Sequence, residues 1–288
     1  MESSFATTEP VGIMDSVILT SLDDGILTIS LNNPSVRNAL SQPMGAQLQR
    51  ELRDAANDPG VRVVILTGVG EAFCAGADVS KLGVLDPADK VMAKYADDPI
   101  MQGFEQRSLR IRGNADTATL LHAMGKPTIA MVRGPAAGAG MSMAIACDFR
   151  IASETAFFTT AFSRIGASGD LGCAYYLMQL VGPTKARELL MLSDKVDAAE
   201  ALRIGLVSKV VADADLLAET MTFARRLADG PPVAIRYIKS NLIAAEGINM
   251  DAYLEQEARN MLRCFQTDDS KEAIAAFKDK RPPVFKGM

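Results

Sequence analysis

Two short segments made almost entirely of apolar residues constrain the fold of this chain most strongly. They are VVILT at 63–67 and TIAMV at 128–132. A strand that is apolar on both faces must be covered on both, which is typical of a parallel sheet between helices. Each segment is followed by a loop rich in glycine and alanine, FCAGAD at 73–78 and GPAAGAG at 134–140. The pattern therefore predicts an α/β fold.

The N-terminal half adds three elements to this expectation. Residues 17–33 alternate apolar and polar side chains around Asp24-Gly25, which predicts a β-hairpin. Ser41 is expected to cap a helix that runs to about Ala56. Residues 148–162 give two more short strands, so strands and helices alternate through this half of the chain.

From about residue 170 the spacing of apolar residues becomes helical. We expect two helices that meet at Gly182, a short helix that ends at Gly205, a strand over 206–211, and three or four helices over 212–280. The 288 residues fit one main domain with an appendage. We predict a flexible N-terminus at 1–14, a core at 15–210 and a helical C-terminal region at 211–288.

Composition excludes several classes of protein. The net charge of −5 leaves no electrostatic footprint for nucleic acid. No apolar run reaches 18 residues, and the first 14 residues lack the apolar core of a signal peptide, so we expect a cytoplasmic protein. The four cysteines are scattered and His122 is the single histidine, which argues against a metal site, a disulfide framework and a histidine-dependent triad. We expect His122 to be structural, at the end of a helix.

The two glycine-rich loops are the first candidates for a functional site. A loop between a strand and a helix presents free backbone N–H groups. Two such loops side by side can direct two N–H groups at one oxygen atom, which is an oxyanion hole. They could also bind phosphate, or simply pack tightly. The nucleotide patterns GxxxxGK[ST] and GxGxxG are absent from the sequence, which makes a nucleotide site less favoured.

The order and spacing of several segments resemble those of the crotonase (enoyl-CoA hydratase/isomerase) superfamily. The resemblance covers about residues 15–286. The matching segments include LNNPSVRNALS, VVILTGVGEAFCAGADVS, KPTIAMVRGPAAGAGMSMAIACDFRIAS, RIGASGDLGCAYYLMQLVGPTKARELLML, AAEALRIGLVSKVV and GPPVAIRYIKSNL.

The resemblance implies a crotonase-like spiral of ββα turns with a C-terminal helical region that packs on trimer neighbours, so a homotrimer or a dimer of trimers is expected. It implies an acyl-CoA substrate, in which coenzyme A is part of the substrate and no separate cofactor is needed. The thioester carbonyl would lie in an oxyanion hole formed by the N–H groups of Ala77 and Ala139. Family members often have glycine at the second position, and alanine keeps the N–H.

The positions of the family's acidic residues are unusual in this chain. Hydratases of the superfamily use two glutamates around one water. The matching positions hold Ser142 and Phe162, neither of which can serve as that acid or base. In isomerase-like members and aryl-CoA dehalogenases an aspartate follows the Arg-Ile-Gly segment, and Asp170 occupies that place. Burial would raise the pKa of Asp170 and make it a usable base. The residues around Asp170 alone favour a cap for a helix over 171–181, whereas the family position favours a catalytic role, and the two roles are compatible.

Other residues take minor roles in this prediction. Asp78 and Asp148 are expected to order loops, and Cys74 and Cys147 to fill space. The resemblance places Arg37 near coenzyme A and Lys280 near its nucleotide end, together with Lys278 and Arg281. Ala75, Ser142 and Phe162 are further candidates for substrate contact. The segment 81–115, with Met92 and Met101, is expected to line the acyl pocket, and Glu105 and Asp116 could reach it.

Four functions are compatible with this set. The favoured one is an enoyl-CoA isomerase in which Asp170 moves a proton on an enolate. A hydratase would need Asp170, or a water held by Ser142, in place of the missing pair. A nucleophilic role for Asp170 is less favoured, because the chain has one histidine and no tryptophan. The fourth is a binding protein that retains the fold without catalysis.

Overall fold

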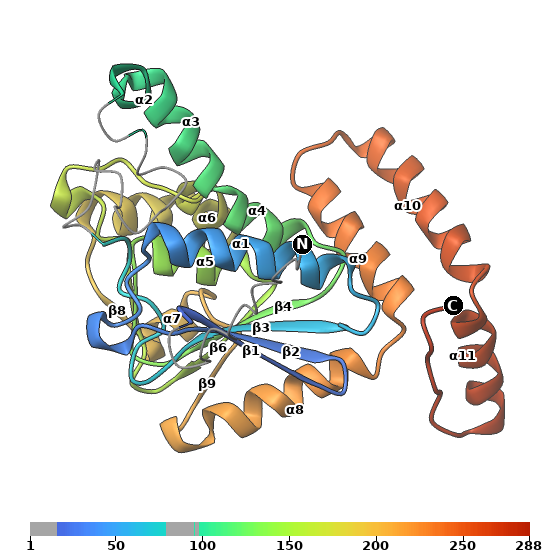
Figure 1. Cartoon of the computed structure of the whole chain (residues 1–288). Coiled ribbons are helices and arrows are strands. Elements are labelled where there is room, and N and C mark those ends of the chain that lie inside the picture. Colours follow the sequence, from blue (N-terminus) through green and yellow to red (C-terminus); the bar gives the residue numbers. More distant parts are fainter. Residues whose placement is uncertain (1–15, 79–94, 96–97) are drawn as a thin grey trace, which may run out of the picture.

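A six-stranded sheet forms the centre of the protein, of which the computed structural model describes residues 16–78, 95 and 98–288 (Figure 1). The predicted flexible N-terminus at 1–14 lies outside the described residues. The strand order is β1-β2-β3-β4-β6-β9, and after the antiparallel pair β1 and β2 every neighbouring pair is parallel. The strands are β1 (Ile18–Asp23), β2 (Ile26–Leu31), β3 (Val63–Gly68), β4 (Thr128–Val132), β6 (Phe149–Ser153) and β9 (Lys209–Val211). The predicted hairpin and buried parallel strands are confirmed.

A second, three-stranded sheet was not predicted as a sheet. It consists of β5 (Pro135–Ala137), β7 (Phe157–Thr159) and β8 (Val196–Asp197). Of these, the sequence indicated only β7. Strands of two or three residues are too short to show an alternating pattern, so only the pairing of distant segments defines them.

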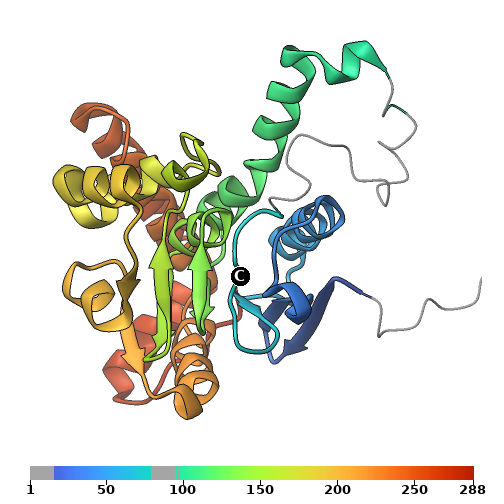
Figure 2. The same ribbon diagram turned by 90° about the vertical axis from the view of Figure 1, so that its left-hand side faces the viewer.

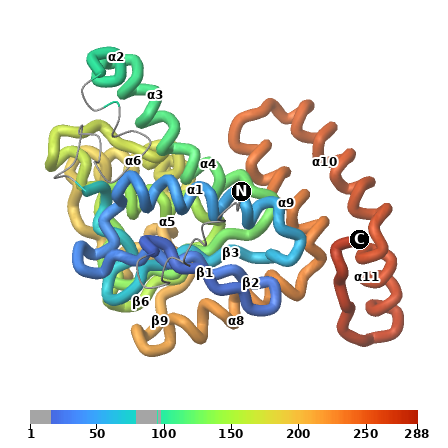
Figure 3. Tube along the Cα trace, in the orientation of Figure 1, coloured from blue at the N-terminus to red at the C-terminus, as the bar shows by residue number. Residues whose placement is uncertain are grey.

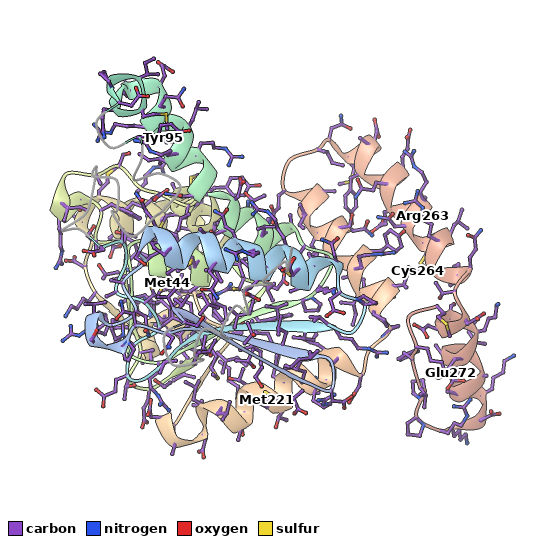
Figure 4. The ribbon with its side chains drawn as sticks, in the orientation of Figure 1. Met44, Tyr95, Met221, Arg263, Cys264 and Glu272 are labelled. Carbon is purple, nitrogen blue, oxygen red and sulfur yellow. The ribbon has the colours of Figure 1, made fainter. Side chains whose placement is uncertain are left out.

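The central sheet is covered on both faces, as its apolar strands require. In β3, Val64 and Leu66 belong to one cluster of buried side chains and Val63 and Ile65 to another. The first cluster includes Met44 of α1 (Gln42–Asn57), which Ser41 caps as predicted by accepting the N–H of Met44. The second is covered by α8 (Leu216–Ala228), including Met221. Figure 4 shows Met44 and Met221 on opposite sides of the sheet.

The other regular elements of the described chain are helices. They are α2 (Pro99–Gln102), α3 (Phe104–Asn114), α4 (Asp116–Ala123), α5 (Ala139–Ala146), α6 (Cys173–Leu192), α7 (Ala198–Arg203), α9 (Pro232–Ala245), α10 (Met250–Phe265) and α11 (Asp268–Asp279), with 3-10 turns η2 (Pro34–Val36), η5 (Ser163–Ile165) and η6 (Asp213–Asp215). The two helices expected around Gly182 form α6, which is kinked there because Gly182 has φ 75° and ψ 165°. Figure 2 shows α2 and α3 extending away from the sheets.

One buried ion pair attaches the C-terminal helices to the central sheet. Lys239 Nζ of α9 lies 2.7 Å from Asp148 Oδ2, which also accepts the backbone N–H of Thr128 at 2.7 Å. These hydrogen bonds confirm the predicted structural role of Asp148. The end of the chain folds back on α11 (Figure 3), where the Asp268 N–H donates to the Met288 carbonyl oxygen at 2.7 Å. Within the described residues, no helix is long and apolar enough to cross a membrane.

Candidate active site

Backbone hydrogen bonds join the two predicted glycine-rich loops side by side. The Cys74 N–H donates to the Pro135 carbonyl oxygen, and the Ala137 N–H donates to the Cys74 carbonyl oxygen, each at 3.0 Å. On its other side the first loop pairs with the segment before α1, where the Leu40 N–H donates to the Gly76 carbonyl oxygen at 2.7 Å. Three segments that are distant in sequence therefore run together in register.

Glycine is required at the closest approach of the two loops. A Cβ atom on Gly140 would collide with the Cys74 carbonyl oxygen and lie 2.7 Å from Cys74 Cβ. Gly138 has φ 51° and ψ −121°, a conformation that other residues rarely adopt. A Cβ atom on Gly138 would lie 3.8 Å from Gly76 Cα, so the two loops touch at these residues.

The residues that follow this contact, Ala77 and Ala139, carry the two predicted oxyanion donors. Ala139 is the first residue of α5, so its N–H has no partner within the helix. Its N-cap, Gly138, has no side chain that could accept a hydrogen bond. Within the described part of the chain, neither the Ala77 nor the Ala139 N–H donates a backbone hydrogen bond. The geometry thus places two available N–H groups on adjacent loops.

The two positions that hold glutamate in hydratases of the superfamily are buried in this protein. The Ser142 side chain is fully buried in α5, and its hydroxyl donates to the Gly138 carbonyl oxygen at 3.1 Å. Phe162 is also buried and belongs to the main core cluster. A hydroxyl that is engaged by its own helix is poorly placed to hold a reactive water.

Asp170 lies in a turn whose backbone is unusual. Gly169, Leu171 and Gly172 all have positive φ, at 131°, 52° and 72°. The alternative that Asp170 caps a helix over 171–181 is wrong, because α6 begins at Cys173 and its N-cap is Gly172. The Asp170 carboxylate instead accepts the N–H of Leu171, the next residue, at 2.7 Å.

Burial raises the pKa of Asp170 above its ordinary value, because the charged carboxylate loses solvation there. The hydrogen bond from Leu171 acts in the opposite direction and is the weaker influence. A carboxyl group with a raised pKa holds a proton more readily than an ordinary aspartate, which suits a group that must both accept and return one.

A thiol that the sequence analysis did not select connects Asp170 with α5. Cys173 is buried, and burial raises its pKa to about 11, so it stays protonated. The Ser142 hydroxyl lowers that pKa, and the charge of Asp170 raises it. Cys173 begins α6 three residues after Asp170, and α6 packs against α5, the helix that carries Ser142. The signal available in the sequence was only that Cys173 follows Asp170 by three residues.

Arg37 and Ala75 lie next to each other beside the two loops. The Ala75 N–H donates to the Arg37 carbonyl oxygen at 3.0 Å. The Arg37 side chain is exposed and lines a cavity of about 790 Å³ together with Glu71, Arg133 and Asp213. Asn38, another residue the sequence analysis did not select, holds this segment in place because its side-chain amide donates to the carbonyl oxygens of Val69 and Ala72.

The C-terminal residues that were predicted to contact coenzyme A do not lie near Asp170 of the same chain. Lys280 ends α11, which lies at the opposite end of the molecule from α6 (Figure 1). Arg281 is paired with Glu272 at 2.6 Å. Of the expected acyl-pocket segment, residues 81–94 with Met92 lie outside the described residues, whereas Met101 lies in α2. Asp116 forms an exposed ion pair with Arg112 at 2.9 Å.

Comparison with known proteins places this arrangement in context. A family model described as enoyl-CoA hydratase/isomerase matches residues 21–288. The chain is 32% identical to the 1,2-epoxyphenylacetyl-CoA isomerase of Escherichia coli, over 95% of this chain and 100% of that protein. It is 33% identical to the short-chain-enoyl-CoA hydratase of Clostridium acetobutylicum, over 93% and 96%. A solved enoyl-CoA hydratase from Polaromonas sp. JS666 superposes with a TM-score of 0.80 at 32% identity, over 93% and 99%.

The close contact between the two loops predicts opposite changes in the free energy of unfolding for two glycine substitutions. Gly140→Ala should destabilise the protein by about 3 kcal/mol, because the new methyl group meets buried backbone. Gly45→Ala in α1 is the matched control, since no atom lies within 4 Å of a Cβ there, and it should stabilise by about 0.5–1 kcal/mol. Urea unfolding followed by circular dichroism measures both. Equal free energies of unfolding for the two variants would contradict the close approach of the loops.

Proposed function

The chain belongs to the enoyl-CoA hydratase/isomerase family, and on that premise we propose that it is an enoyl-CoA isomerase in which Asp170 moves the proton. One observation carries the proposal. A partly buried carboxyl group with a raised pKa lies in the turn before α6, which packs against α5, whereas the positions of the hydratase glutamates hold Ser142 and Phe162, both buried. The names of the relatives include both hydratases and an isomerase, so the choice rests on these side chains.

The proposed reaction shifts a double bond from the 3- to the 2-position of an enoyl-CoA. The Asp170 carboxylate removes a proton from C2, and the electrons of that C–H bond move into the thioester carbonyl. The resulting enolate oxygen accepts hydrogen bonds from the N–H groups of Ala77 and Ala139. The protonated Asp170 then returns the proton to C4, and the double bond forms between C2 and C3. The reaction needs no cofactor, because coenzyme A is part of the substrate.

The substrate contacts follow from the placement of these groups. Arg37 and Ala75 are proposed to flank the coenzyme A portion, because they adjoin the loop that carries Ala77. Phe162 and Ser142 would bound the acyl side of the site, where a dry surface disfavours water addition. Lys280 could contribute only from a neighbouring chain, given the distance between α11 and α6 (Figure 1).

The reaction type can be tested directly on two substrates. The purified protein is incubated in heavy water with a 3-enoyl-CoA and, separately, with a 2-enoyl-CoA, and the products are identified by mass spectrometry. We expect the 3-enoyl ester to become the 2-enoyl ester with no water added, and the 2-enoyl ester to remain unhydrated. Hydration of the 2-enoyl ester would support a hydratase, and binding of both esters without turnover would support a binding protein.

Asp170→Asn should lower kcat by about 10²–10⁴-fold, because the amide cannot accept the proton. In the wild-type protein, kcat/KM should fall as the pH drops through the pKa of Asp170. That midpoint should lie above the ordinary value of 3.8, since burial raises the pKa and only the deprotonated form is the base. Asp116→Asn, in an exposed ion pair on α4, is the matched control. An unchanged kcat in Asp170→Asn would show that another group moves the proton.

Ala139→Pro tests the oxyanion donor without changing a side-chain charge. Proline removes the N–H but suits the first position of a helix, where that N–H has no helical partner. We expect kcat to fall by about 10²–10³-fold, the usual effect of losing one donor. The thermal midpoint and a far-ultraviolet circular dichroism spectrum check that the variant is folded. A folded Ala139→Pro variant with normal kcat would exclude this N–H from catalysis.

We further propose that the chain assembles as a homotrimer or a dimer of trimers through α9, α10 and α11. These helices expose large apolar side chains, and Phe277 is 86% exposed. Figure 4 shows α10, with Arg263 and Cys264, and α11, with Glu272, projecting from the body of the molecule. Clusters of exposed apolar side chains mark interaction surfaces. The exposed members are Ile238, Leu242, Met250, Leu254, Met261, Leu262, Phe265, Ile274 and Phe277.

Light scattering coupled to size-exclusion chromatography measures the assembly. We expect a mass of three or six chains, and the double substitution Leu262→Asp and Phe277→Asp should shift it to one chain, because buried unpaired carboxylates oppose association. Leu22→Asp, on the exposed β1 strand, is the control and should leave the mass unchanged. A single-chain mass for the wild-type protein would contradict the proposal.

A further inference from the structure

A cluster of polar side chains outside the proposed catalytic groups joins three helices at one carboxylate. Glu246, the C-cap of α9, accepts hydrogen bonds on a single oxygen, Oε2, from His122 Nε2 and from the Tyr175 hydroxyl. Both distances are 3.0 Å. His122 lies in the last turn of α4, where the sequence predicted it, and Tyr175 in the first turn of α6. The C-terminal region is thereby tied to the beginning of the helix that follows Asp170.

The hydrogen bond between His122 and Glu246 is more protected from water than an ordinary surface contact. The side chains of His122 and Glu246 are only 21% and 19% exposed. Hydrogen bonds that involve a charged partner contribute about twice as much as neutral ones. Burial raises the pKa of Tyr175, and so does the neighbouring carboxylate, so its hydroxyl keeps the proton that it donates. A partly buried carboxylate with two donors therefore fixes the relative positions of the three helices.

A cluster of aromatic rings, packed at tilted and edge-on angles, extends from this carboxylate to the Asp170 turn. The centroid of the His122 ring lies 5.0 Å from the centroid of the Tyr176 ring. The centroid of the Tyr175 ring lies 5.4 Å from that of Tyr176. The Tyr176 ring is packed against Gly172, where a Cβ atom would lie 3.0 Å from Tyr176 Cε2. Gly172 belongs to the turn of positive φ that presents Asp170. Glu246 thus contacts His122 and Tyr175, whose rings pack on Tyr176, and Tyr176 in turn packs on the Asp170 turn.

We propose that Glu246 is a positioning residue for the Asp170 turn, which it holds through His122, Tyr175 and Tyr176. It touches none of the reacting atoms. Glu246 ends α9, the first of the three C-terminal helices α9, α10 and α11. The same contact therefore holds this region against the body of the protein and holds the proposed base in place. The consequences for turnover rest on the proposed function, whereas those for the conformation of the turn do not.

The turnover test compares Glu246→Ala with Glu246→Gln on the 3-enoyl-CoA substrate, using the full chain. We expect Glu246→Ala to lower kcat about tenfold with KM within about twofold, since a lost charge-assisted hydrogen bond costs about that factor. Glu246→Gln should restore most of kcat, because its amide can hydrogen bond with both partners. Glu219→Ala, which removes an exposed ion pair with Lys209 and lies on α8 outside the proposed interface, is the matched control. An unchanged kcat, or a change in KM alone, in Glu246→Ala would overturn the proposal.

A second readout does not depend on activity. Cys173 is buried at the end of the Asp170 turn, so its rate of alkylation by iodoacetamide reports how tightly the turn is held. We expect about tenfold faster labelling of Cys173 in Glu246→Ala and in Tyr175→Phe, a milder variant at a half-exposed side chain. Labelling of the buried Cys74 should stay constant, as should labelling of Cys173 in Glu219→Ala. Unchanged Cys173 labelling in Tyr175→Phe would overturn the proposal even if the enzyme catalyses another reaction.

Discussion

The close backbone contact between the loop after β3 and the loop after β4 is the constraint on which the rest of the site depends. Two hydrogen bonds between Cys74 and the strand β5 set the register, and Gly140 allows α5 to begin against the Cys74 carbonyl oxygen. A side chain at Gly140 would push the head of α5 away from the first loop. The N–H group of Ala139 would then move away from the loop that carries Ala77.

The position of the proposed base depends on a different part of the structure. Asp170 is carried by a turn in which Leu171, a buried non-glycine residue, has φ 52°. Such a conformation is unfavourable in isolation and persists where the surroundings impose it. The packing of Tyr176 against Gly172 and the burial of Leu171 supply those surroundings. A rigid turn of this kind suits a group that must take a proton from one carbon and return it to another.

The absence of both hydratase acids has a structural counterpart in the buried environment of the site. Ser142 directs its hydroxyl to its own helix, Phe162 packs in the core, and the Cys173 thiol remains protonated between Ser142 and Asp170. The addition of water to a double bond needs one group of the enzyme to act as a base on the water and another to act as an acid toward the substrate. The proposed isomerase reaction needs only one such group, the carboxyl group of Asp170, because it moves a proton within one substrate.

The sequence by itself determined the class of fold, the parallel strands, the hairpin, the cap at Ser41 and the two loops, because each depends on local patterns of apolar and turn-forming residues. It also marked Asp170, Ala77 and Ala139 through their family positions. It could not determine that α6 begins at Cys173 rather than after Asp170, that β5 and β8 form a second sheet, or that Cys173, His122 and Glu246 support the turn. These features come from contacts between segments up to 124 residues apart, and no local propensity encodes them. Only the packed tertiary structure brings such residues within hydrogen-bonding distance.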